Sequence, residues 1–244
     1  MVHKSLFVLG TCLVVGVLGA LALVSAPSTT APARTDRNSP VVVELFTSQG
    51  CSSCPPADAL LEDLTRRSDL LPLAFHIDYW DRLGWRDPFS SPQATDRQKN
   101  YARLLRLSSA YTPQMVINGR ADVVGSDRRR VMATIDGQGS LPVSVALTAD
   151  GNGLLAAIGA GSGEGKLWLV TFDRSAETRV PAGENAGRTI LNVNIVRAIN
   201  DVGVWDGDAK SLRLARPADG KGGAALLLQA PSGAILGAAS LSLS

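Results

Sequence analysis

The sequence predicts an α/β domain over residues 41–137, with a mixed sheet flanked by helices, followed by an antiparallel β-sandwich-like domain over residues 138–244. Two observations carry this prediction. Up to residue 137, apolar runs of strand length alternate with segments whose apolar residues recur every three to four positions. After that point, short strand-like runs follow one another, and Gly, Asp, Asn and Ser separate them.

The N-terminal 40 residues are expected to be an export signal and a linker. His3 and Lys4 precede an almost uncharged apolar run over residues 6–24, the pattern of a secretory signal. This run approaches the roughly 20 residues of a membrane-spanning helix, so residues 1–26 are either a cleaved signal or a membrane anchor. Residues 27–40, rich in Pro, Ser, Thr and Ala, predict a flexible linker. We therefore expect an exported protein, periplasmic or extracellular, in a compartment where disulfides persist.

The predicted α/β part begins with residues 41–46, a nearly continuous apolar run that is typical of a buried parallel strand. Leucines at helical spacing predict a helix over residues 57–67, and apolar alternation predicts a second strand over 73–79. The remaining predicted elements are a helix over 91–107, two strands over 114–117 and 121–124 joined by an Asn-Gly turn, and a helix to about 135. Six strands are predicted after the boundary, over residues 143–148, 154–160, 166–172, 191–199, 211–215 and 224–229.

Cys51 and Cys54 lie between the first predicted strand and the first predicted helix. The third cysteine, Cys12, falls in the signal segment, so this pair is the cysteine content of the folded part. Closing so short a loop stabilises a fold little, and a zinc site would need two further Cys or His ligands. At a helix start, free N–H groups and the helix dipole stabilise a thiolate. We therefore expect Cys51 as the exposed nucleophile and Cys54 as the resolving thiol.

The charge balance argues against nucleic acid as a partner. The chain has 24 Lys and Arg against 22 Asp and Glu, for a formal net charge of +2 at pH 7. Nucleic-acid-binding domains usually carry a strongly basic patch instead. The one basic run, residues 128–130, is predicted to be a solvated helix face.

These motifs resemble those of thioredoxins, in which a strand leads into CxxC at a helix start and a later proline precedes another strand. Residues 41–136 cover that pattern. More narrowly, the chain resembles an exported bacterial thioredoxin-like family of unknown function, domain-of-unknown-function family 1223. The segments that carry this resemblance are 44–58, 76–81, 84–85, 111–115, 187–189 and 194–197. The resemblance implies a thioredoxin-like domain for residues 41–137.

The resemblance also implies roles for single residues. Thr112 and Pro113 match a thioredoxin peptide bond that is cis, packs against the cysteines and leaves backbone groups free to pair with an extended substrate. Glu44 resembles the buried acid that takes a proton from the resolving thiol, although it lies one residue further from the first cysteine. Burial would raise the pKa of such a carboxyl and suit it to proton transfer. A hydrogen-bonded structural glutamate is the alternative for Glu44.

Four other side chains are candidates for the surroundings of the site. His76 and Asp78 fall on one face of the second strand and could face the site. His76 is either a structural histidine or a proton donor or metal ligand. Trp80 and Trp85 are expected either to form an apolar wall that binds substrate or to pack in the core.

The resulting expectation is an extracytoplasmic thiol–disulfide oxidoreductase that acts on protein or peptide thiols and disulfides. Its redox centre would be the Cys51–Cys54 disulfide, with no further cofactor and no bound metal, and a membrane electron donor or acceptor is a candidate partner. Two alternatives stay open. Cys51, Cys54 and His76 could handle Cu(I), which soft thiolates favour, or the scaffold could be a non-catalytic binding module. The β-rich half shows no nucleophile–base set and is expected to bind a partner or stabilise the fold.

Overall fold

The computed structural model describes residues 1–2, 39–218 and 221–243. The predicted signal or anchor over residues 1–26, apart from its first two residues, and most of the linker over 27–40 therefore lie outside the described residues. Within the described ranges, no helix combines the length and the apolar character needed to cross a membrane. The described residues from 39 onward belong to one compact unit.

The first half of this unit alternates strands and helices in the order that the hydrophobic pattern predicts. Its elements are β1 (Val41–Thr47), α1 (Pro55–Leu64), β2 (Leu70–His76), the 3-10 helix η1 (Asp81–Leu83), α2 (Pro92–Leu104), β3 (Gln114–Ile117), β4 (Ala121–Val124) and α3 (Arg128–Asp136). Strand β2 begins and ends three residues earlier than predicted. Pro72 lies within β2 and pairs in register with Val43.

The second half consists of strands. They are β5 (Val145–Asp150), β6 (Gly153–Ile158), β7 (Gly165–Arg179), β8 (Thr189–Trp205), β9 (Lys210–Ala215), β10 (Gly223–Gln229) and β11 (Ile235–Ser242). Strands β7 and β8 are much longer than the sequence predicted. Strand β11 was missed because its middle residues, Gly237 to Ser240, are small and have weak strand propensity.

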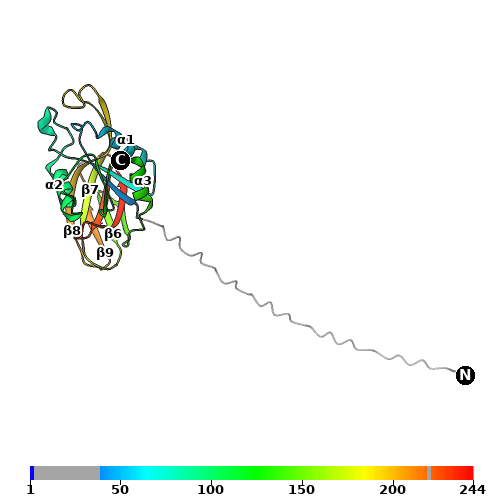
Figure 1. The fold of residues 1–244 in the computed structure, drawn as a ribbon. Helices are drawn as coiled ribbons and strands as arrows, with labels where there is room; N and C mark the ends of the chain where they lie inside the picture. Colours follow the sequence, from blue (N-terminus) through cyan, green and yellow to red (C-terminus); the bar gives the residue numbers. More distant parts are fainter. Residues whose placement is uncertain (3–38, 219–220, 244) are drawn as a thin grey trace. The chain divides into compact units, whose positions relative to one another are not determined.

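Eight of these strands form one mixed sheet in the order β11-β10-β7-β8-β2-β1-β3-β4 (Figure 1). Strand β2 runs parallel to β1, and β3 runs antiparallel to it. The two halves of the chain join where β8 pairs with β2, at Ile195 and Ala74. The boundary predicted near residue 138 therefore does not separate two sheets. Strand β8 covers the edge of β2 that an isolated first half would leave unpaired.

The remaining strands form a three-stranded antiparallel sheet in the order β5-β6-β9. An apolar cluster joins it to the large sheet, with Leu154 on β6, Leu167 on β7 and Leu226 on β10 among its members. The molecule is thus a mixed sheet with helices and further antiparallel strands. The antiparallel strands expected over residues 138–244 are present, but β7, β8, β10 and β11 belong to the large sheet and not to a separate domain sheet.

Helices cover both faces of the large sheet near β1. On one face, α1 and α3 pack against Val43 and Leu45. On the opposite face, Tyr101 of α2 packs against Phe46 and Phe75. Figure 1 shows α2 on the other side of the sheet from α1 and α3. Alternate residues of β1 therefore point toward different helices, and this arrangement decides which side chains can reach the cysteines.

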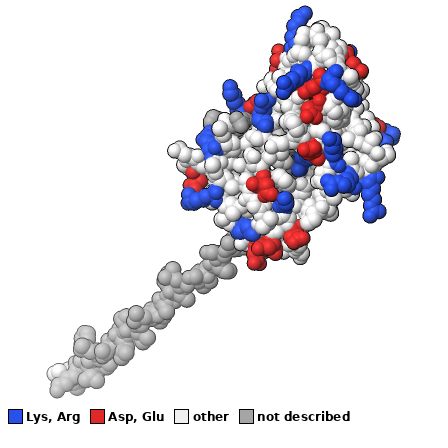
Figure 2. Space-filling model, turned by 90° about the vertical axis from the view of Figure 1, so that its left-hand side faces the viewer, with Lys and Arg blue, Asp and Glu red and all other residues white. Residues whose placement is uncertain are grey.

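Charges of both signs are interspersed on the face drawn in Figure 2. Arg128, Arg129 and Arg130 are exposed in the first turn of α3, so this run is a solvated helix face as predicted. The Arg128 guanidinium donates a 2.6 Å hydrogen bond to Asp63 of α1.

Candidate functional site

Cys51 and Cys54 form a disulfide where β1 leads into α1, with their Cα atoms 5.4 Å apart. Cys54 is the N-cap residue of α1, and prolines fill the next two positions. Proline suits a first helical turn because its missing N–H would have no partner there. The Cys54 amide donates to the Cys51 carbonyl at 3.2 Å, so a tight turn holds both cysteines at the helix start.

Both cysteines have 0% of their surface exposed. The expectation that Cys51 is exposed is therefore wrong for this structure, although Ser52 and Ser53 between the cysteines are exposed. Helix geometry alone would leave Cys51 open to solvent. Segments distant in the sequence, whose contacts follow, surround the loop that carries it.

Trp80 and Thr112 meet at the sulfur of Cys51. The Thr112 hydroxyl donates to Cys51 Sγ over 3.3 Å and accepts a 2.8 Å hydrogen bond from the Trp80 indole N–H. The peptide bond from Thr112 to Pro113 is cis, as the resemblance implies. The Pro113 carbonyl accepts a hydrogen bond from the Gly125 amide, which ties this loop to the end of β4. The structure thus brings three predicted site residues to the disulfide.

Trp85 contacts the loop before Cys51 through the Gln49 side chain. Its indole N–H donates to the side-chain oxygen of Gln49 over 3.2 Å. The buried Gln49 side chain in turn donates to Asn192 of β8 over 2.9 Å. Trp85 therefore positions the loop before Cys51.

Asp58 is a site residue that the sequence reasoning missed. It lies on α1 four residues after Cys54, which places it one turn along the same helix face. Its buried carboxylate accepts a 2.8 Å hydrogen bond from the Thr47 hydroxyl. Burial raises the Asp58 pKa to about 7, and nearby His76 and the Thr47 hydrogen bond only partly oppose this. The four-residue spacing at a predicted helix start was the signal that could have found it.

His76 forms a buried ion pair with Asp87, another residue that the sequence reasoning missed. Nδ1 of His76 lies 2.7 Å from Oδ2 of Asp87, and both side chains are fully buried. Burial alone disfavours the imidazolium, but the Asp87 carboxylate overcomes this and raises the His76 pKa. Conversely, despite its burial, His76 keeps the Asp87 pKa below its ordinary value. Nε2 of His76 has no hydrogen-bond partner among the described residues.

Glu44 does not lie beneath Cys54, and that expectation is corrected. Its neighbours Val43 and Leu45 point toward α1, so Glu44 faces α2 instead. There the buried Glu44 carboxylate forms an ion pair with the Arg97 guanidinium and accepts a 2.6 Å hydrogen bond from the Tyr101 hydroxyl. The alternative reading, a hydrogen-bonded structural glutamate, describes these contacts.

Asp78 also lies outside the disulfide surroundings. Its carboxylate accepts a 2.6 Å hydrogen bond from the Thr95 hydroxyl, and its amide donates to the same oxygen. Asp78 thus fastens the loop after β2 to the start of α2. In the part of the chain that the structure describes, no group of three or more His, Cys, Asp and Glu side chains is arranged to hold a metal ion.

The tip of the β7–β8 hairpin reaches the cysteine loop, which no sequence pattern predicted. The Asn185 side-chain amide donates to the carbonyl oxygens of Gln49 and Cys51, each over 2.9 Å. The Glu184 carboxylate accepts a 3.0 Å hydrogen bond from the Ser52 amide. These contacts join the second half of the chain to the disulfide.

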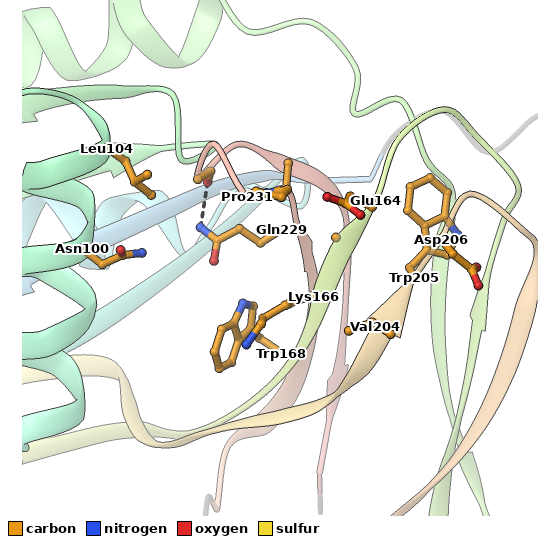
Figure 3. Close-up of a pocket in the computed structure, with 13 residues that line it drawn as sticks. Asn100, Leu104, Glu164, Lys166, Trp168, Val204, Trp205, Asp206, Gln229 and Pro231 are labelled. Carbon is orange, nitrogen blue, oxygen red and sulfur yellow. Dashed lines mark hydrogen bonds between the residues drawn. The ribbon is translucent and has the colours of Figure 1, made fainter.

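A pocket of about 530 Å³ lies between α2 and the strands β7, β8 and β10, and shares no lining residue with the disulfide surroundings. Figure 3 shows Lys166 and Trp168 of β7 on one side and Asn100 and Leu104 of α2 on another. The Lys166 ammonium lies 5.5 Å from the centroid of the Trp168 ring. The pocket contains none of the predicted site residues.

The comparisons with known proteins agree with the motifs. Among solved structures, the chain is similar to protein AGR_C_4864 from Agrobacterium tumefaciens at 37% identity and a TM-score of 0.75, covering 84% of this chain and 95% of that one. HBP35 of Porphyromonas gingivalis is 14% identical, with a TM-score of 0.60 over 84% of this chain and 76% of that one, a likeness of fold alone. No curated protein matches the chain. Residues 42–229 match the family described as Protein of unknown function (DUF1223), and the chain belongs to that family.

Proposed function

We propose that this protein is a thioredoxin-like thiol–disulfide oxidoreductase. The observation that carries the proposal is the Cys51–Cys54 disulfide at the N-terminus of α1, with the buried carboxyl of Asp58 one turn further on. The cis bond before Pro113 supports the thioredoxin-like assignment, because the resemblance implies it. The course of the chain also fits, since β1 leads to the cysteines at the start of α1 and Pro113 directly precedes β3.

The proposed reaction transfers two electrons between dithiol and disulfide. In the reducing direction, the Cys51 thiolate attacks a substrate disulfide, forms a bond to one substrate sulfur and releases the other as a thiolate. Cys54 then gives its proton to Asp58 and attacks Cys51 Sγ. This step forms the Cys51–Cys54 disulfide and releases the second substrate thiolate. The opposite direction uses the same steps in reverse and oxidises a substrate dithiol.

Asp58 takes the base role that the resemblance implied for Glu44. A pKa of about 7 suits a group that must both accept and return a proton near neutral pH. The ion pair of His76 and Asp87 is close enough to Asp58 to influence its titration. Removing the imidazolium would take away a charge that stabilises the Asp58 carboxylate.

Protein or peptide thiols and disulfides are the proposed substrates, because Thr112 and Pro113 lie beside Cys51 where an extended chain would pair. We place the activity outside the cytoplasm on the strength of the N-terminal apolar run. A membrane electron donor or acceptor would then reset the cysteine pair.

The test is an equilibrium redox titration of the full-length protein against glutathione, combined with trapping of mixed disulfides. The pair should titrate as one two-electron couple. Cys54→Ser should accumulate a mixed disulfide at Cys51, because no resolving thiol remains, whereas Cys51→Ser should accumulate little. If both variants stay free of mixed disulfides with glutathione and with a cystine-containing peptide, the proposal fails.

A further inference from the structure

The tip of the β7–β8 hairpin, residues Val180–Arg188, closes over the cysteine loop, and we call it the cap. We propose that the cap must swing away before Cys51 can react, and that Asn185 is the residue that holds it closed. The biological purpose of this gate rests on the proposed oxidoreductase function. The gate itself is a property of the disulfide and can be measured without any protein substrate.

Asn185 fastens the cap to the backbone of the cysteine loop. Only 1% of the residue is exposed, and its side-chain amide donates 2.9 Å hydrogen bonds to the carbonyls of Gln49 and Cys51. Its side-chain oxygen accepts a 3.2 Å hydrogen bond from the Arg188 guanidinium, so the cap itself orients the amide. A buried carbonyl that loses its donor is costly, and these bonds therefore favour the closed position.

Glu184 adds a contact that depends on the redox state. Its carboxylate accepts from the Ser52 amide next to Cys51. Hydrogen bonding by Ser52, first through its side chain and then through its amide, lowers the Glu184 pKa. A negative charge is favourable at the start of α1 while Cys51 is in a disulfide. Once Cys51 becomes a thiolate, the two negative charges repel each other. Reduction should therefore loosen the cap, although the exposure of Glu184 keeps this contribution small.

The cap lies at the end of a two-stranded ribbon formed by the outer parts of β7 and β8. Strand β10 pairs with β7 only as far as Phe172, and β8 pairs with β2 at Ile195. Beyond these points, in the described strands, the ends of β7 and β8 pair only with each other, out to Arg179 and Thr189. Its inner part is fixed, because Asn192 accepts a hydrogen bond from Gln49 and Val193 packs in the apolar cluster of α1. Beyond Asn192 only Glu177–Arg179 and Thr189–Leu191 pair with each other, and so short a two-stranded ribbon is marginally stable.

The closed cap blocks the reaction because a nucleophile must contact sulfur along the S–S axis, and Cys51 has no exposed surface. Thr112 and Trp80 adjoin the sulfur on one side. The cap binds the loop that carries the sulfur, and Figure 1 shows its yellow loop at the end of the sheet where α1 starts. The cap can move with the outermost pairs of this ribbon, whereas Thr112 and Trp80 belong to the body of the fold.

The test is the rate at which dithiothreitol reduces the disulfide in the oxidised, full-length protein. The reagent supplies two electrons and two protons and leaves as its cyclic disulfide, while Cys51 and Cys54 become thiols. Rapid alkylation and mass spectrometry count the product. If the cap is a gate, the wild-type rate should level off with rising reagent concentration at the rate of opening.

Asn185→Asp replaces the donating amide with a carboxylate that faces the two carbonyls, so the cap should open. Reduction at low reagent concentration should become at least about tenfold faster, and the plateau should disappear. Asn152→Asp is the matched control, because it makes the same change at an exposed turn between β5 and β6. Its reduction rate should equal that of the wild type.

A second variant replaces residues 180–188 with Asn-Gly, a two-residue turn that can join the paired residues Arg179 and Thr189. It should also be reduced faster than the wild type. Wild-type rates in both variants would overturn the gate, and so would loss of the folded state in both, because the cap would then be needed for folding.

These reduction rates, taken together with exchange of the wild type with a cystine-containing peptide, separate the gate from the proposed function. If dithiothreitol reduces the two variants faster but the wild type exchanges with no peptide, the gate is supported and the oxidoreductase proposal is contradicted. If the wild type exchanges with the peptide but both variants are reduced at the wild-type rate, the oxidoreductase proposal is supported and the gate is contradicted.

Discussion

The Thr47 hydroxyl donates a 2.8 Å hydrogen bond to Oδ1 of Asp58, and so joins the last residue of β1 to the first turn of α1. This bond favours the charged carboxylate, yet burial dominates and raises the Asp58 pKa to about 7. The fold therefore contains a carboxyl group whose charged form is destabilised by burial. Such strain at a functional residue is usually tolerated for the sake of chemistry.

Asp58→Asn should stabilise the oxidised protein at high pH. The folded pKa of about 7 lies above the ordinary value of 3.8, so the folded state retains a proton that the unfolded state has lost across that window. The free energy of unfolding then falls as pH rises from about 4 to 7. Asparagine does not titrate and still accepts from Thr47, so the variant should gain roughly 2–4 kcal/mol at pH 8 and little below pH 4. Urea unfolding at pH 4, 6 and 8 measures this difference.

The same variant should slow the step in which Cys54 resolves a mixed disulfide, by about a hundredfold, because its proton acceptor is gone. The first attack by Cys51 should change less. Stopped-flow release of glutathione from a preformed mixed disulfide separates the two steps. An unchanged rate of resolution would remove Asp58 from the mechanism.

Asp87→Asn should destabilise the fold most strongly near pH 6. The depressed Asp87 pKa contributes stability above about pH 4, and the raised His76 pKa contributes stability below about pH 6.5 that is lost as pH rises through the folded pKa. The substitution leaves a buried imidazolium without its carboxylate, which costs about 3–5 kcal/mol. Urea melts at pH 6 and pH 9 measure this. Asp63→Asn is the exposed control, and its stability should change little.

Glu44→Gln should weaken the fold and leave the redox kinetics alone. Arg97 is buried beside this carboxylate, so loss of the negative charge should cost about 3 kcal/mol. Because Glu44 faces α2, the rate of glutathione exchange per folded molecule and its pH dependence should match those of the wild type. If the pH dependence of the exchange rate changes as it does in Asp58→Asn, Glu44 takes part in the proton transfer and this prediction is wrong.

Thr112→Val and Trp80→Phe should act through one shared interaction. The Thr112 hydroxyl donates to Cys51 Sγ, and the Trp80 indole holds that hydroxyl in place. Each variant should slow alkylation of Cys51 in the reduced protein, about fivefold for the loss of one hydrogen bond to the thiolate and less for Trp80→Phe. The double variant should match Thr112→Val alone. Additive effects would show that the two side chains act separately.

The order of elements and the position of the cysteines were predictable because they depend on local patterns. The face of the sheet toward which the Glu44 side chain points was not predictable. Residues 41–46 are apolar on both faces, as in a strand covered on both sides, so no alternation shows where each side chain points. A shift of one residue moves a side chain to the other face, and this explains why the assignment to the cysteines failed.

The contacts of Asn185 were beyond sequence reasoning for a different reason. They join a hairpin tip to a loop far earlier in the chain, and no local period reports which distant loops meet. The outer parts of β7 and β8 were also missed, because their alternating exposed residues look like loop. Asp58 differs, since its helical spacing from Cys54 was visible in the sequence.

The pairing of Ala74 with Ile195 also bears on how this chain can be cut and how it is made. Contacts between residues so far apart form late, because the ribosome releases the cysteines and α1 long before β8. A fragment that stops at residue 137 would present an open strand edge to its neighbours and invite aggregation. It would also present its disulfide to every thiol in solution. The segment that looks like a portable redox module is therefore inseparable from the hundred residues that follow it.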